Sequence, residues 1–505
     1  MYIRSKKNKS GSVSVQIISK DKGKYLVVKS LGVARNSVEE TNLKILAKEE
    51  LKKLEIQTSM EFLSEKDCII STFLNHCNAP VVVNIGPELI LGKIFNTIGF
   101  KEIPEGLFKH ITLARLTYPV SKLKTTDYLL QHKNIEIDVD KIYRFLDKFH
   151  KKYKRKVEDI VFNYSKSVLG KISIMFYDMT TLYFEAEDED DLRKIGFSKD
   201  GKFQCPQIML GLIVGEQGYP IAYNIYEGNT FEGKTIIPMI KEVQNRYNLP
   251  KPTIIADSGL LSTNNVNSLS DMQYEFILGA RIKNETDVIK QKILEKSKDL
   301  KDKENFIIHK SKNLRLIVSY SIQRAKKDKY NREKGLRRLK QKIQSGKITK
   351  EHINNRGYNK FLILNNEVSV RLDESKIQED EKWDGLKGYI TNHKTFTAEE
   401  TIANYNHLWK IEKAFRISKT DLRIRPVFHR KRDRIEAHIC IAFAAYAIYK
   451  ELERRLEINS INISPAKAIE LSKTIFEIEF SLPDSKEKRK IFNYLSDLQK
   501  KILNM

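Results

Sequence analysis

Ile172-Ser173-Ile174-Met175-Phe176-Tyr177-Asp178 is the stretch from which the predicted fold is built. Residues 172 to 177 are mostly apolar and rich in β-branched and aromatic side chains, a composition that favours a buried strand. Residues 181 to 184 continue this strand or pair with it. The apolar run ends at Asp178, so we expect an acidic side chain where the strand leaves the core.

Further strands are expected downstream, because short apolar runs alternate there with turn-forming residues. Gly215-Glu216-Gln217-Gly218 separates two such runs as a hairpin turn would, and Ser262-Thr263-Asn264 can cap a helix. We therefore predict strands at 209–214, 221–226, 253–256 and 276–278, and a helix at 234–247. Three antiparallel strands followed by alternating helix and strand are typical of an α/β, RNase H-like core.

Positive charge dominates the whole chain. The 505 residues include 90 Lys and Arg against 65 Asp and Glu, which gives a formal net charge of +25. Because this charge is spread along the sequence, we expect a large polyanionic partner, and nucleic acid is the first choice. A ribosomal protein or a membrane-surface protein would also suit such a balance.

The sequence shows no sign of export, structural zinc or a membrane span. The four cysteines lack paired spacing, and the N-terminus lacks the apolar stretch of a signal peptide. His76-Cys77 has no partner at zinc-like spacing. The apolar run Ile439 to Tyr449 is shorter than the roughly 20 residues that span a bilayer, so it predicts a buried helix. We expect a cytoplasmic protein, associated with the bacterial nucleoid and not with a membrane.

The N-terminal residues 1–165 are expected to form an α+β DNA-binding region. Val13, Val15 and Ile17 alternate with polar residues up to a turn at residues 20–23, which indicates a β-hairpin. From about Val38 the apolar spacing becomes helical.

A basic helix is predicted near the end of this region. Ile142, Phe145, Leu146 and Phe149 have helical spacing beneath a face of lysine and arginine. With a shorter helix capped at Thr125-Thr126-Asp127, residues 120–155 could form a helix-turn-helix-like pair that reads DNA. An ordinary solvated basic helix fits the pattern equally well.

Residues 285–385 interrupt the core pattern and look like an insertion. They contain strand-like runs at 306–308, 314–320, 361–364 and 368–372, and a very basic, largely helical stretch from Arg324 to Lys350. The expected domains are the N-terminal region (1–165), the core (166–284 and 386–455), the insertion (285–385) and a C-terminal helical tail (456–505).

Two aspartates have matching positions at the ends of predicted strands. Asp178 ends the first strand, and Asp257 ends Thr253-Ile254-Ile255-Ala256. If the two strands are neighbours, these carboxylates lie within metal-bridging distance of each other. Aspartates at strand ends are also common turn formers, and this alternative stays open for each residue.

Glu412 is a third candidate because of its place on a helix. Thr397-Ala398-Glu399-Glu400 is a Thr-x-x-Glu capping box that starts the helix. Tyr405, Glu412 and Lys419 then follow at seven-residue intervals, on a stripe that includes apolar residues. A buried carboxylate needs a cation or a metal, so we interpret Glu412 as a metal ligand, with a structural ion pair as the alternative. The acidic run at residues 185–191 is interpreted as a solvated loop, because its spacing fits no calcium-binding loop.

The stretch Tyr405-x2-Leu408-x3-Glu412-x6-Lys419 resembles the Y-x2-R-x3-E-x6-K signature of the insertion-sequence-four superfamily of DDE transposases. Other blocks of that group are matched in order by residues 177–182, 218–221, 227–229 and 256–259. The amino-acid sequence at residues 409–416 and 425–427 is most similar to that of the insertion-sequence-1634 branch. The resemblance covers about residues 120 to 450.

This resemblance implies that Asp178, Asp257 and Glu412 form a catalytic, metal-binding triad. It also implies that Tyr405 and Lys419 contact the DNA backbone, and that the insertion is a mostly β domain. The signature arginine is Leu408 here, for which Arg416 is a candidate substitute. Arg416, Arg423 and Arg425, close behind the triad, are expected to neutralise phosphates.

The implied chemistry is phosphoryl transfer with two Mg²⁺ ions, for which Mn²⁺ can substitute. Two ions held ~4 Å apart would activate a water and then a 3′-hydroxyl for attack on phosphate. We therefore expect an insertion-sequence transposase that acts on double-stranded DNA, at terminal inverted repeats and target DNA, as a DNA-assembled homodimer. The alternatives are an RNase H-like structure-specific DNA nuclease and a non-catalytic, transposase-derived DNA-binding protein.

Overall fold

The computed structural model describes residues 1–21, 23–60, 64–76, 81–199, 201–345, 353–354, 357–365, 369–482, 485 and 487–505. The chain divides into two compact units. The first comprises Met1–Val82 and Glu477–Asn493, and the second comprises Val83–Phe476 and Tyr494–Met505.

The first unit begins with the predicted hairpin. β2 (Val13–Asp21) pairs antiparallel with β3 (Lys24–Ala34), and β1 (Tyr2–Lys7) adds a third strand on the other side of β2. Residue 22 of the expected turn lies outside the described residues. α1 (Ser37–Met60) packs on β2 and β3, and α2 (Glu65–His76) follows it. The hairpin and the helix from about Val38 are thus confirmed.

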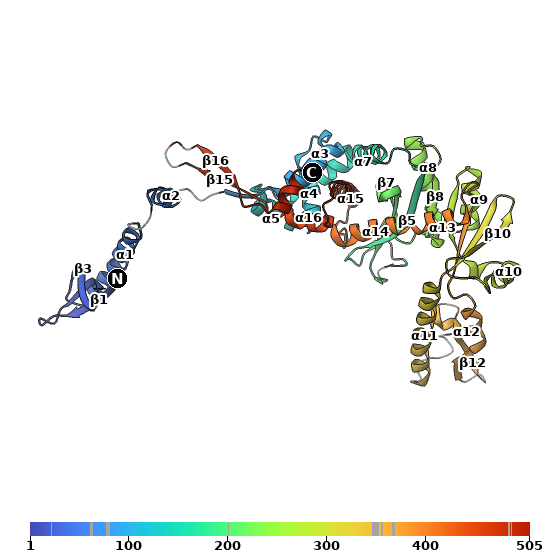
Figure 1. Ribbon diagram of the computed structural model, residues 1–505, viewed down its shortest axis with the longest axis horizontal. Coiled ribbons are helices and arrows are strands. Elements are labelled where there is room, and N and C mark those ends of the chain that lie inside the picture. Colours follow the sequence, from blue (N-terminus) through green and yellow to red (C-terminus); the bar gives the residue numbers. More distant parts are fainter. Residues whose placement is uncertain are drawn as a thin grey trace. The chain divides into compact units, whose positions relative to one another are not determined.

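An eight-stranded mixed sheet forms the centre of the second unit (Figure 1). Its order is β10-β11-β14-β9-β8-β5-β6-β7. β5, β8 and β9 run parallel, whereas β6, β7, β14 and β11 join through antiparallel pairs. The strands are β5 (Ile174–Tyr183), β6 (Gln207–Gly215), β7 (Pro220–Glu227), β8 (Thr253–Ala256), β9 (Phe276–Ala280), β10 (Asn305–Ser311), β11 (Leu314–Tyr320) and β14 (Leu386–Thr391).

Alternate residues of the central strands enter two different cores. Phe176 and Ile255 belong to the larger core, which contains most of α15 (Arg432–Ile458). Met175 and Ile254 belong to the core beneath α8 (Ile236–Tyr247) and α9 (Thr263–Asp271). This alternation follows from the two-residue period of a strand. The same alternation determines on which face of the sheet the side chains of Asp178 and Asp257 lie.

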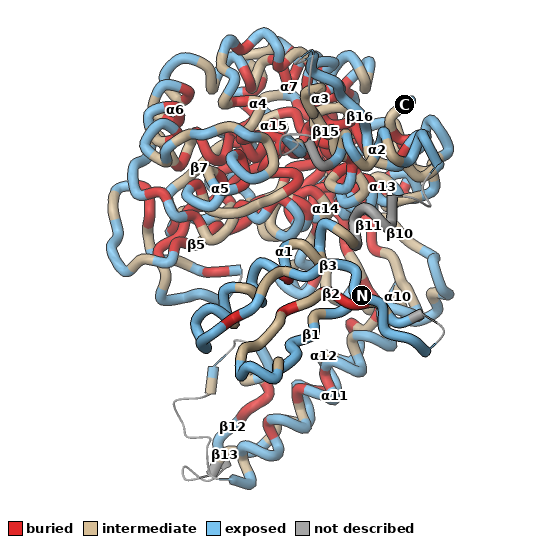
Figure 2. Tube along the Cα trace, turned by 90° about the vertical axis from the view of Figure 1, so that its left-hand side faces the viewer, coloured by how far each residue is buried: buried red, intermediate tan, exposed pale blue. Residues whose placement is uncertain are grey.

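Helices cover the larger core, and α15 lies among them (Figure 2). Residues 439–449 of α15 are buried throughout, which confirms the predicted buried helix. The helices before the sheet are α3 (Gly86–Ile98), α4 (Gly106–Thr117), α5 (Lys122–Lys133), α6 (Val139–Lys152) and α7 (Lys154–Leu169). α16 (Pro465–Ser472) and α17 (Asp497–Leu503) close the unit.

The predicted basic helix is α6, and its four apolar residues are buried against this core. The preceding helix, α5, begins four residues earlier than expected, because Ser121 and not Thr125 is its cap. The Ser121 hydroxyl accepts from the Lys124 amide, whereas Thr125 lies inside the helix. Whether this pair reads DNA stays a prediction.

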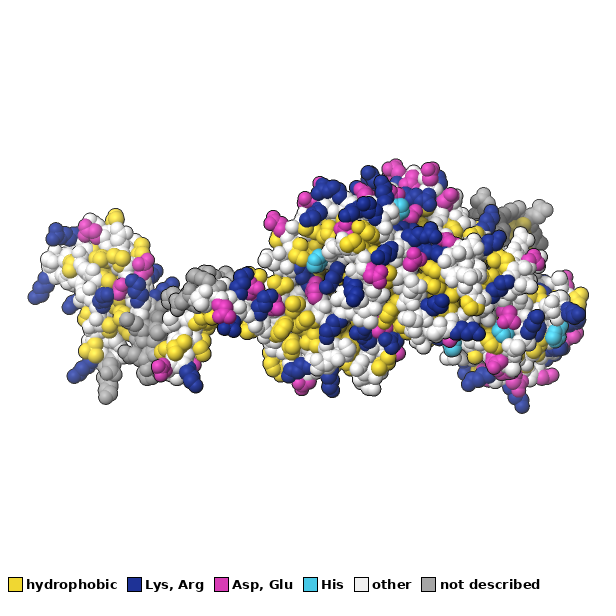
Figure 3. All heavy atoms as spheres, turned by 90° about the horizontal axis from the view of Figure 1, so that it is seen from above, with side chains coloured by type: hydrophobic (Ala, Val, Ile, Leu, Met, Phe, Trp, Pro, Cys, Tyr) yellow, Lys and Arg dark blue, Asp and Glu magenta, His cyan; other side chains and the backbone are white. Residues whose placement is uncertain are grey.

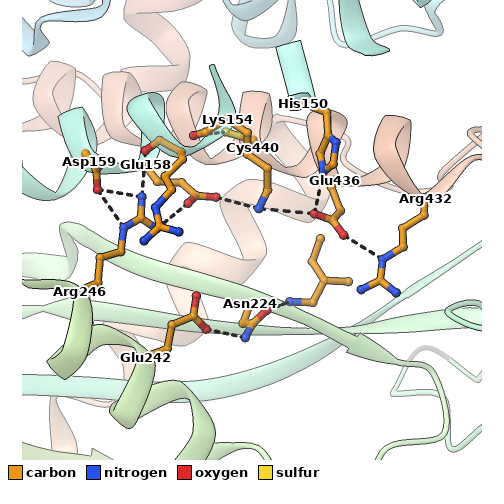
Figure 4. A network of polar contacts seen from close by, with 12 residues as sticks. His150, Lys154, Glu158, Asp159, Asn224, Glu242, Arg246, Arg432, Glu436 and Cys440 are labelled. Atoms are coloured by element: carbon orange, nitrogen blue, oxygen red, sulfur yellow. Dashed lines mark hydrogen bonds and ion pairs between the residues drawn. The ribbon is translucent and has the colours of Figure 1, made fainter. Parts of the chain in front are cut away.

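A polar network ties α6, α7, α8 and α15 together beside the sheet (Figure 4). Arg246 on α8 donates to Asp159 at 2.9 Å and to Glu158 at 2.7 Å. Lys154 lies 3.1 Å from Glu158 and 3.4 Å from Glu436 of α15. Each buried charge therefore has partners, which is the condition for tolerating charge at such a depth.

The segment 285–385 differs from the expected mostly β insertion. Its described residues form three helices, α10 (Asp287–Ser297), α11 (Ile322–Gln344) and α12 (Glu374–Glu381). β10 and β11 extend the central sheet, while β12 (Leu362–Asn365) and β13 (Ser369–Leu372) form a separate hairpin. The basic stretch is helical as predicted, but residues 346–350 of it lie outside the described part. Apolar runs reveal strands, but they do not reveal which sheet the strands join.

The C-terminal stretch expected to be helical also contains strands. β15 (Phe476–Ser481) and β16 (Lys488–Phe492) pair antiparallel, and β15 also pairs with β4 (Val81–Asn84). None of the described helices has the length and apolar character needed to cross a membrane.

Candidate active site

Asp178 and Asp257 lie side by side on one face of the central sheet. β5 and β8 are adjacent and parallel, with Tyr177 opposite Ala256, so the two aspartates form the next pair in register. Asp178 is two residues beyond Phe176, and Asp257 is two residues beyond Ile255, so both share the face of the larger core. The condition for metal-bridging distance, that the two strands be neighbours, is therefore met.

Asp178 lies inside β5, not at its end as we predicted, because the strand continues to Tyr183. Burial raises the pKa of this carboxyl to about 6, while the nearby Lys199 ammonium opposes the rise. A carboxyl in this setting gains from any cation brought close to it.

Lys199 joins Asp178 to a further carboxylate, Glu232. Its Nζ lies 3.8 Å from Asp178 Oδ1 and 2.8 Å from Glu232 Oε1, and it donates to the Met179 carbonyl at 2.6 Å. One ammonium therefore balances two acids at the edge of the site.

The turn that carries Glu232 is fastened to the turn that follows Asp257. Glu232 begins the 3₁₀ turn η3 (Glu232–Lys234), which packs against η4 (Ser258–Leu260). The buried Asn265 amide donates to the carbonyls of Gly233 and Leu260, both at 2.7 Å. Glu232 is thus held beside the two aspartates by packing as well as by Lys199.

Tyr405 of α13 (Ala398–Asn406) holds Asp257 in place through a hydrogen bond. Its hydroxyl donates to Asp257 Oδ1 at 2.8 Å, and the side chain is only 4% exposed. Burial and the Asp257 charge raise the pKa of Tyr405, so the phenol remains a donor. Gly279 on β9 makes this approach possible, since a Cβ there would lie 2.4 Å from the Tyr405 oxygen.

Lys387 on β14 places a second ammonium at this side of the site. Its Nζ lies 4.5 Å from the centre of the Tyr405 ring and 5.4 Å from that of Tyr389. Burial lowers the pKa of Lys387, whereas attraction from Asp257 and Glu412 opposes this effect. Lys387 therefore lies within the electrostatic reach of two predicted triad members.

Glu412 is exposed, which corrects its expected position on an apolar face. The expected single helix is divided into α13 (Ala398–Asn406) and α14 (Trp409–Arg416). His407 and Leu408 form a turn between them, with a hydrogen bond from the Leu408 amide to the Tyr405 carbonyl at 2.9 Å. Because this turn shifts the helical register between α13 and α14, Glu412 does not lie on the same helix face as Tyr405. The capping box at Thr397 is confirmed.

α14 nevertheless carries Glu412 on an element that packs against β5, the strand of Asp178 (Figure 1). Ile411, Ala414 and Phe415 fill the larger core and fix α14 in place. The structure thus brings the segment of Glu412 to the face of the two aspartates, with the carboxylate open to solvent.

The predicted DNA-binding residues lie in different environments. Arg416 and Arg423 are exposed, Arg425 is half-buried, and Lys419 lies in the π-helical turn η8 (Ile417–Asp421). Tyr405 is instead buried on Asp257. Leu408 is buried in the larger core, so its position in the signature does not face solvent. Lysine and arginine side chains are spread over the visible face of the molecule, with acids among them (Figure 3).

The oxygen donors of this site suit a hard divalent cation, since Mg²⁺ prefers carboxylate ligands. Asp178 and Asp257 are neighbours, and Glu232 adds a third carboxylate on the side of Asp178. Within the described part of the chain, no three His, Cys, Asp or Glu side chains are grouped closely enough to hold one ion. The two aspartates thus provide a paired ligand set that Glu412 does not complete in this arrangement.

Sequence reasoning missed Glu232, Lys199 and Lys387. Glu232 follows the matched block at residues 227–229 by three positions, so that block was the signal that could have identified it. Lys199 and Lys387 are single lysines in a lysine-rich chain, and no local pattern distinguishes them. Only the folded sheet brings them to the acids.

A family model described as Transposase DDE domain matches residues 169–448, which is more than half of the chain. The solved structure of a piggyBac transposase synaptic complex with hairpin DNA is similar at 10% identity and a TM-score of 0.39, over 77% of this chain and 76% of that chain. The Mos1 transposase paired-end complex with the left transposon end is similar at 13% identity and a TM-score of 0.16, over 37% of this chain and 57% of that chain. No curated protein matches the sequence.

Proposed function

Because the chain belongs to the family of transposase DDE domains, we propose that it is an insertion-sequence transposase that cuts DNA at transposon ends and joins them to a target. The observation that carries this proposal is the pairing of Asp178 and Asp257 on adjacent parallel strands. The helix of Glu412 packs against the same face. The three residues are proposed to form the catalytic triad.

The sheet topology supports an RNase H-like core. β5, β6 and β7 form three antiparallel strands in sequence, and β8 and β9 then continue from β5 in parallel. This order matches the pattern that we predicted from the sequence. In this proposal, residues 166–284 and 386–455 provide the core, and residues 1–165 provide DNA-binding elements.

Divalent metal is the proposed cofactor, with Asp178, Asp257 and Glu412 as its ligands. Bound Mg²⁺, or Mn²⁺ in its place, would stabilise charge on the scissile phosphate and help to activate the attacking oxygen. The carboxylates of the chain must be ionised to act as ligands. Lys199 balances the negative charge of Asp178 and Glu232, and thereby keeps these acids together in the absence of metal.

The other residues of the site orient the acids and bind DNA. Tyr405 fixes the rotamer of Asp257, because its hydroxyl donates a hydrogen bond to one of the two carboxylate oxygens. Arg416, Lys419, Arg423 and Arg425 are proposed to neutralise DNA phosphates close to the triad. Lys387, close to the Tyr405 ring, adds a positive charge within the electrostatic reach of Asp257 and Glu412.

We further assign the chain to the insertion-sequence-four superfamily, in its insertion-sequence-1634 branch, on the order of the matched sequence blocks. A transposase must act on two ends of one element. We therefore propose a homodimer assembled on terminal inverted repeats.

The test is a cleavage assay on a plasmid that carries the gene with its flanking DNA. Asp178→Asn, Asp257→Asn and Glu412→Gln are compared with Asp271→Asn, which removes an exposed carboxylate at the end of α9. We expect Mg²⁺-dependent nicks at the element ends from the wild type and from the Asp271→Asn variant alone. Normal cleavage by any of the three variants would remove that residue from the triad.

The same assay distinguishes the alternatives. A structure-specific nuclease would cut branched DNA without preference for the element ends. A non-catalytic DNA-binding protein would bind the ends without cutting them. The paired aspartates favour an enzyme over a binding protein, and the sequence blocks favour a transposase over a nuclease.

A further inference from the structure

A pocket of about 400 Å³ in the second unit is lined by basic residues and lies apart from the paired aspartates. Its walls come from the end of α4, the start of α5 with the residues between these helices, Tyr143 of α6, the chain between η8 and α15, and α15 itself. The basic and imidazole side chains that line it are Arg115, Lys122, Arg423, Arg425, His429 and His438. None of the described residues that line it is Asp or Glu.

Two of these cations are buried without an acidic partner among the residues that the structure describes. Arg115 and Lys122 are each 6% exposed. The Arg115 guanidinium reaches the carbonyls of Leu422 and Arg423, both at 3.4 Å. Burial lowers the pKa of Arg115 to about 10, and burial together with Arg115 lowers the pKa of Lys122, with no carboxylate acting on either group.

Buried charge of this kind destabilises the fold unless a counter-ion compensates it. One of the described acids acts on the pocket: Asp147 partly opposes the lowering of the pKa of His429. Asp147 is already bound by Arg434 through two hydrogen bonds of 2.7 and 2.8 Å. The pocket therefore keeps an excess of positive charge.

His438 adds an unsatisfied polar atom to the same pocket. Its Nε2 lies 3.2 Å from the Ile424 carbonyl, which identifies Nε2 as the donor. Its Nδ1 is buried and has no hydrogen-bond partner. Buried polar atoms usually have hydrogen-bond partners. The pocket therefore combines uncompensated positive charge with an unsatisfied polar atom.

The mouth of the pocket lies on the chain that leaves the candidate active site. Arg423 and Arg425 follow α14 and η8 directly, so the segment that carries Glu412 continues into the pocket wall. Phe428, another lining residue, is 65% exposed. A phosphate chain bound along this continuous segment would contact both the helix of Glu412 and the pocket wall.

We propose that this pocket binds a phosphate group, with Arg115 and Lys122 as buried anchors and Arg423 and Arg425 at its mouth. A backbone phosphate of DNA and a free phosphate ion share this chemistry, and the position of the mouth favours DNA. For the DNA source, the inference rests on the proposed function. The binding of free phosphate does not depend on it.

The first experiment measures DNA affinity against salt concentration, using a labelled 40-base-pair duplex from the flanking DNA. Lys122→Met keeps the apolar stem of the lysine and removes its charge. Lys124→Met is the matched control, because Lys124 is exposed on the same helix. We expect the slope of log affinity against log salt to fall by about 0.9 in Lys122→Met, as for one lost phosphate contact, and to fall by less in Lys124→Met.

The second experiment measures thermal unfolding of the full chain with and without inorganic phosphate, at constant ionic strength. Without phosphate, Lys122→Met should be at least as stable as the wild type, because it removes an uncompensated buried charge. A lysine with a purely structural role would instead give a less stable variant. If free phosphate is a ligand, it stabilises the wild type and not Lys122→Met.

The outcomes separate the two sources. A changed DNA slope without phosphate stabilisation identifies a backbone phosphate. Selective stabilisation by phosphate with an unchanged slope identifies a free ion. An unchanged slope with no selective stabilisation overturns the proposal. Should Lys122→Met fail to fold, Arg115→Met takes its place, with the same expectations for the slope and for phosphate.

Failure of the proposed function gives a different result. In that case the wild type makes no metal-dependent nicks at the element ends. The unfolding experiment with inorganic phosphate still tests the pocket, because it measures stability and not cleavage.

Discussion

The Tyr405 hydroxyl donates a hydrogen bond of 2.8 Å to Oδ1 of Asp257. This contact links α13 to the end of β8, and it passes over β9 at Gly279, where a side chain would block it. A residue expected to contact DNA is thus buried against a predicted metal ligand. The carboxylate loses rotational freedom before any metal or DNA binds.

Tyr405→Phe should therefore lower cleavage without weakening DNA binding. A hydrogen bond to a charged group contributes about 1.5–3 kcal/mol, so we expect cleavage to slow by about tenfold or more. The rate is measured with saturating Mg²⁺, and DNA affinity is measured separately in Ca²⁺. A loss of DNA affinity with an unchanged cleavage rate would show that Tyr405 is a backbone contact instead.

Lys199→Met tests the balance of charge between Asp178 and Glu232. Removing the ammonium leaves two acids near each other, so the metal-free protein should lose stability, by about 1 kcal/mol or less for so exposed a pair. Mg²⁺ should then raise the melting temperature of the variant more than that of the wild type. Thermal unfolding with and without Mg²⁺ measures both effects.

The matched control for this prediction is Lys202→Met, which removes an exposed lysine three residues away. It should behave like the wild type in both conditions. Equal responses to Mg²⁺ in Lys199→Met and in the wild type would show that the acids next to Lys199 do not take part in binding metal.

Acid should destabilise the protein through His429. Burial, with Lys122 and Arg115 nearby, lowers the pKa of His429 to about 3, and Asp147 only partly opposes this. An unfolded histidine titrates near 6.5. The stability that His429 contributes is therefore fully present above pH 6.5 and is lost as the pH falls from 6.5 towards 3, by about 1.5 kcal/mol between pH 6.5 and 5.

Urea unfolding at these two pH values measures the effect. His429→Asn should lose less stability on acidification than the wild type. His309→Asn, at an exposed position on β10, should lose as much as the wild type does. If His429→Asn and the wild type respond alike, the imidazole of His429 is not held neutral by its surroundings.

Much of the fold could be predicted because its strands are short apolar runs with clear turns between them. The strand predicted at 253–256 is β8 itself, and Ser262 caps α9 as expected. The break between α13 and α14 could not be predicted, since Tyr405 to Lys419 keeps a helical spacing through it. A two-residue turn changes the face of every later side chain without changing the pattern of residue types.

The site was predictable to the extent that it depends on two neighbouring strands, although Asp178 lies inside β5 and not at its end. Asp178 and Asp257 share a face because both strands are parallel and in register, which the paired motifs indicated. Lys199, Glu232 and Lys387 come from separate elements, so their approach to the acids depends on sheet order and loop packing. Glu412 was selected for burial that it does not have; the resemblance and the packing of α14 against β5 now support it.

Arg246→Met should strongly destabilise the second unit, because it breaks the link between α7 and α8. The guanidinium donates to Glu158, Asp159 and the Arg155 carbonyl, and its side chain is 14% exposed. Removing one member of a buried ion pair typically costs about 3–5 kcal/mol, because the remaining charge is left uncompensated. Urea unfolding of the full chain measures the loss.

Arg144→Met is the control, since its pair with Asp138 is exposed and 3.9 Å long, and it should cost about 1 kcal/mol or less. Equal losses in the two variants would contradict a stabilising role for the network around Arg246.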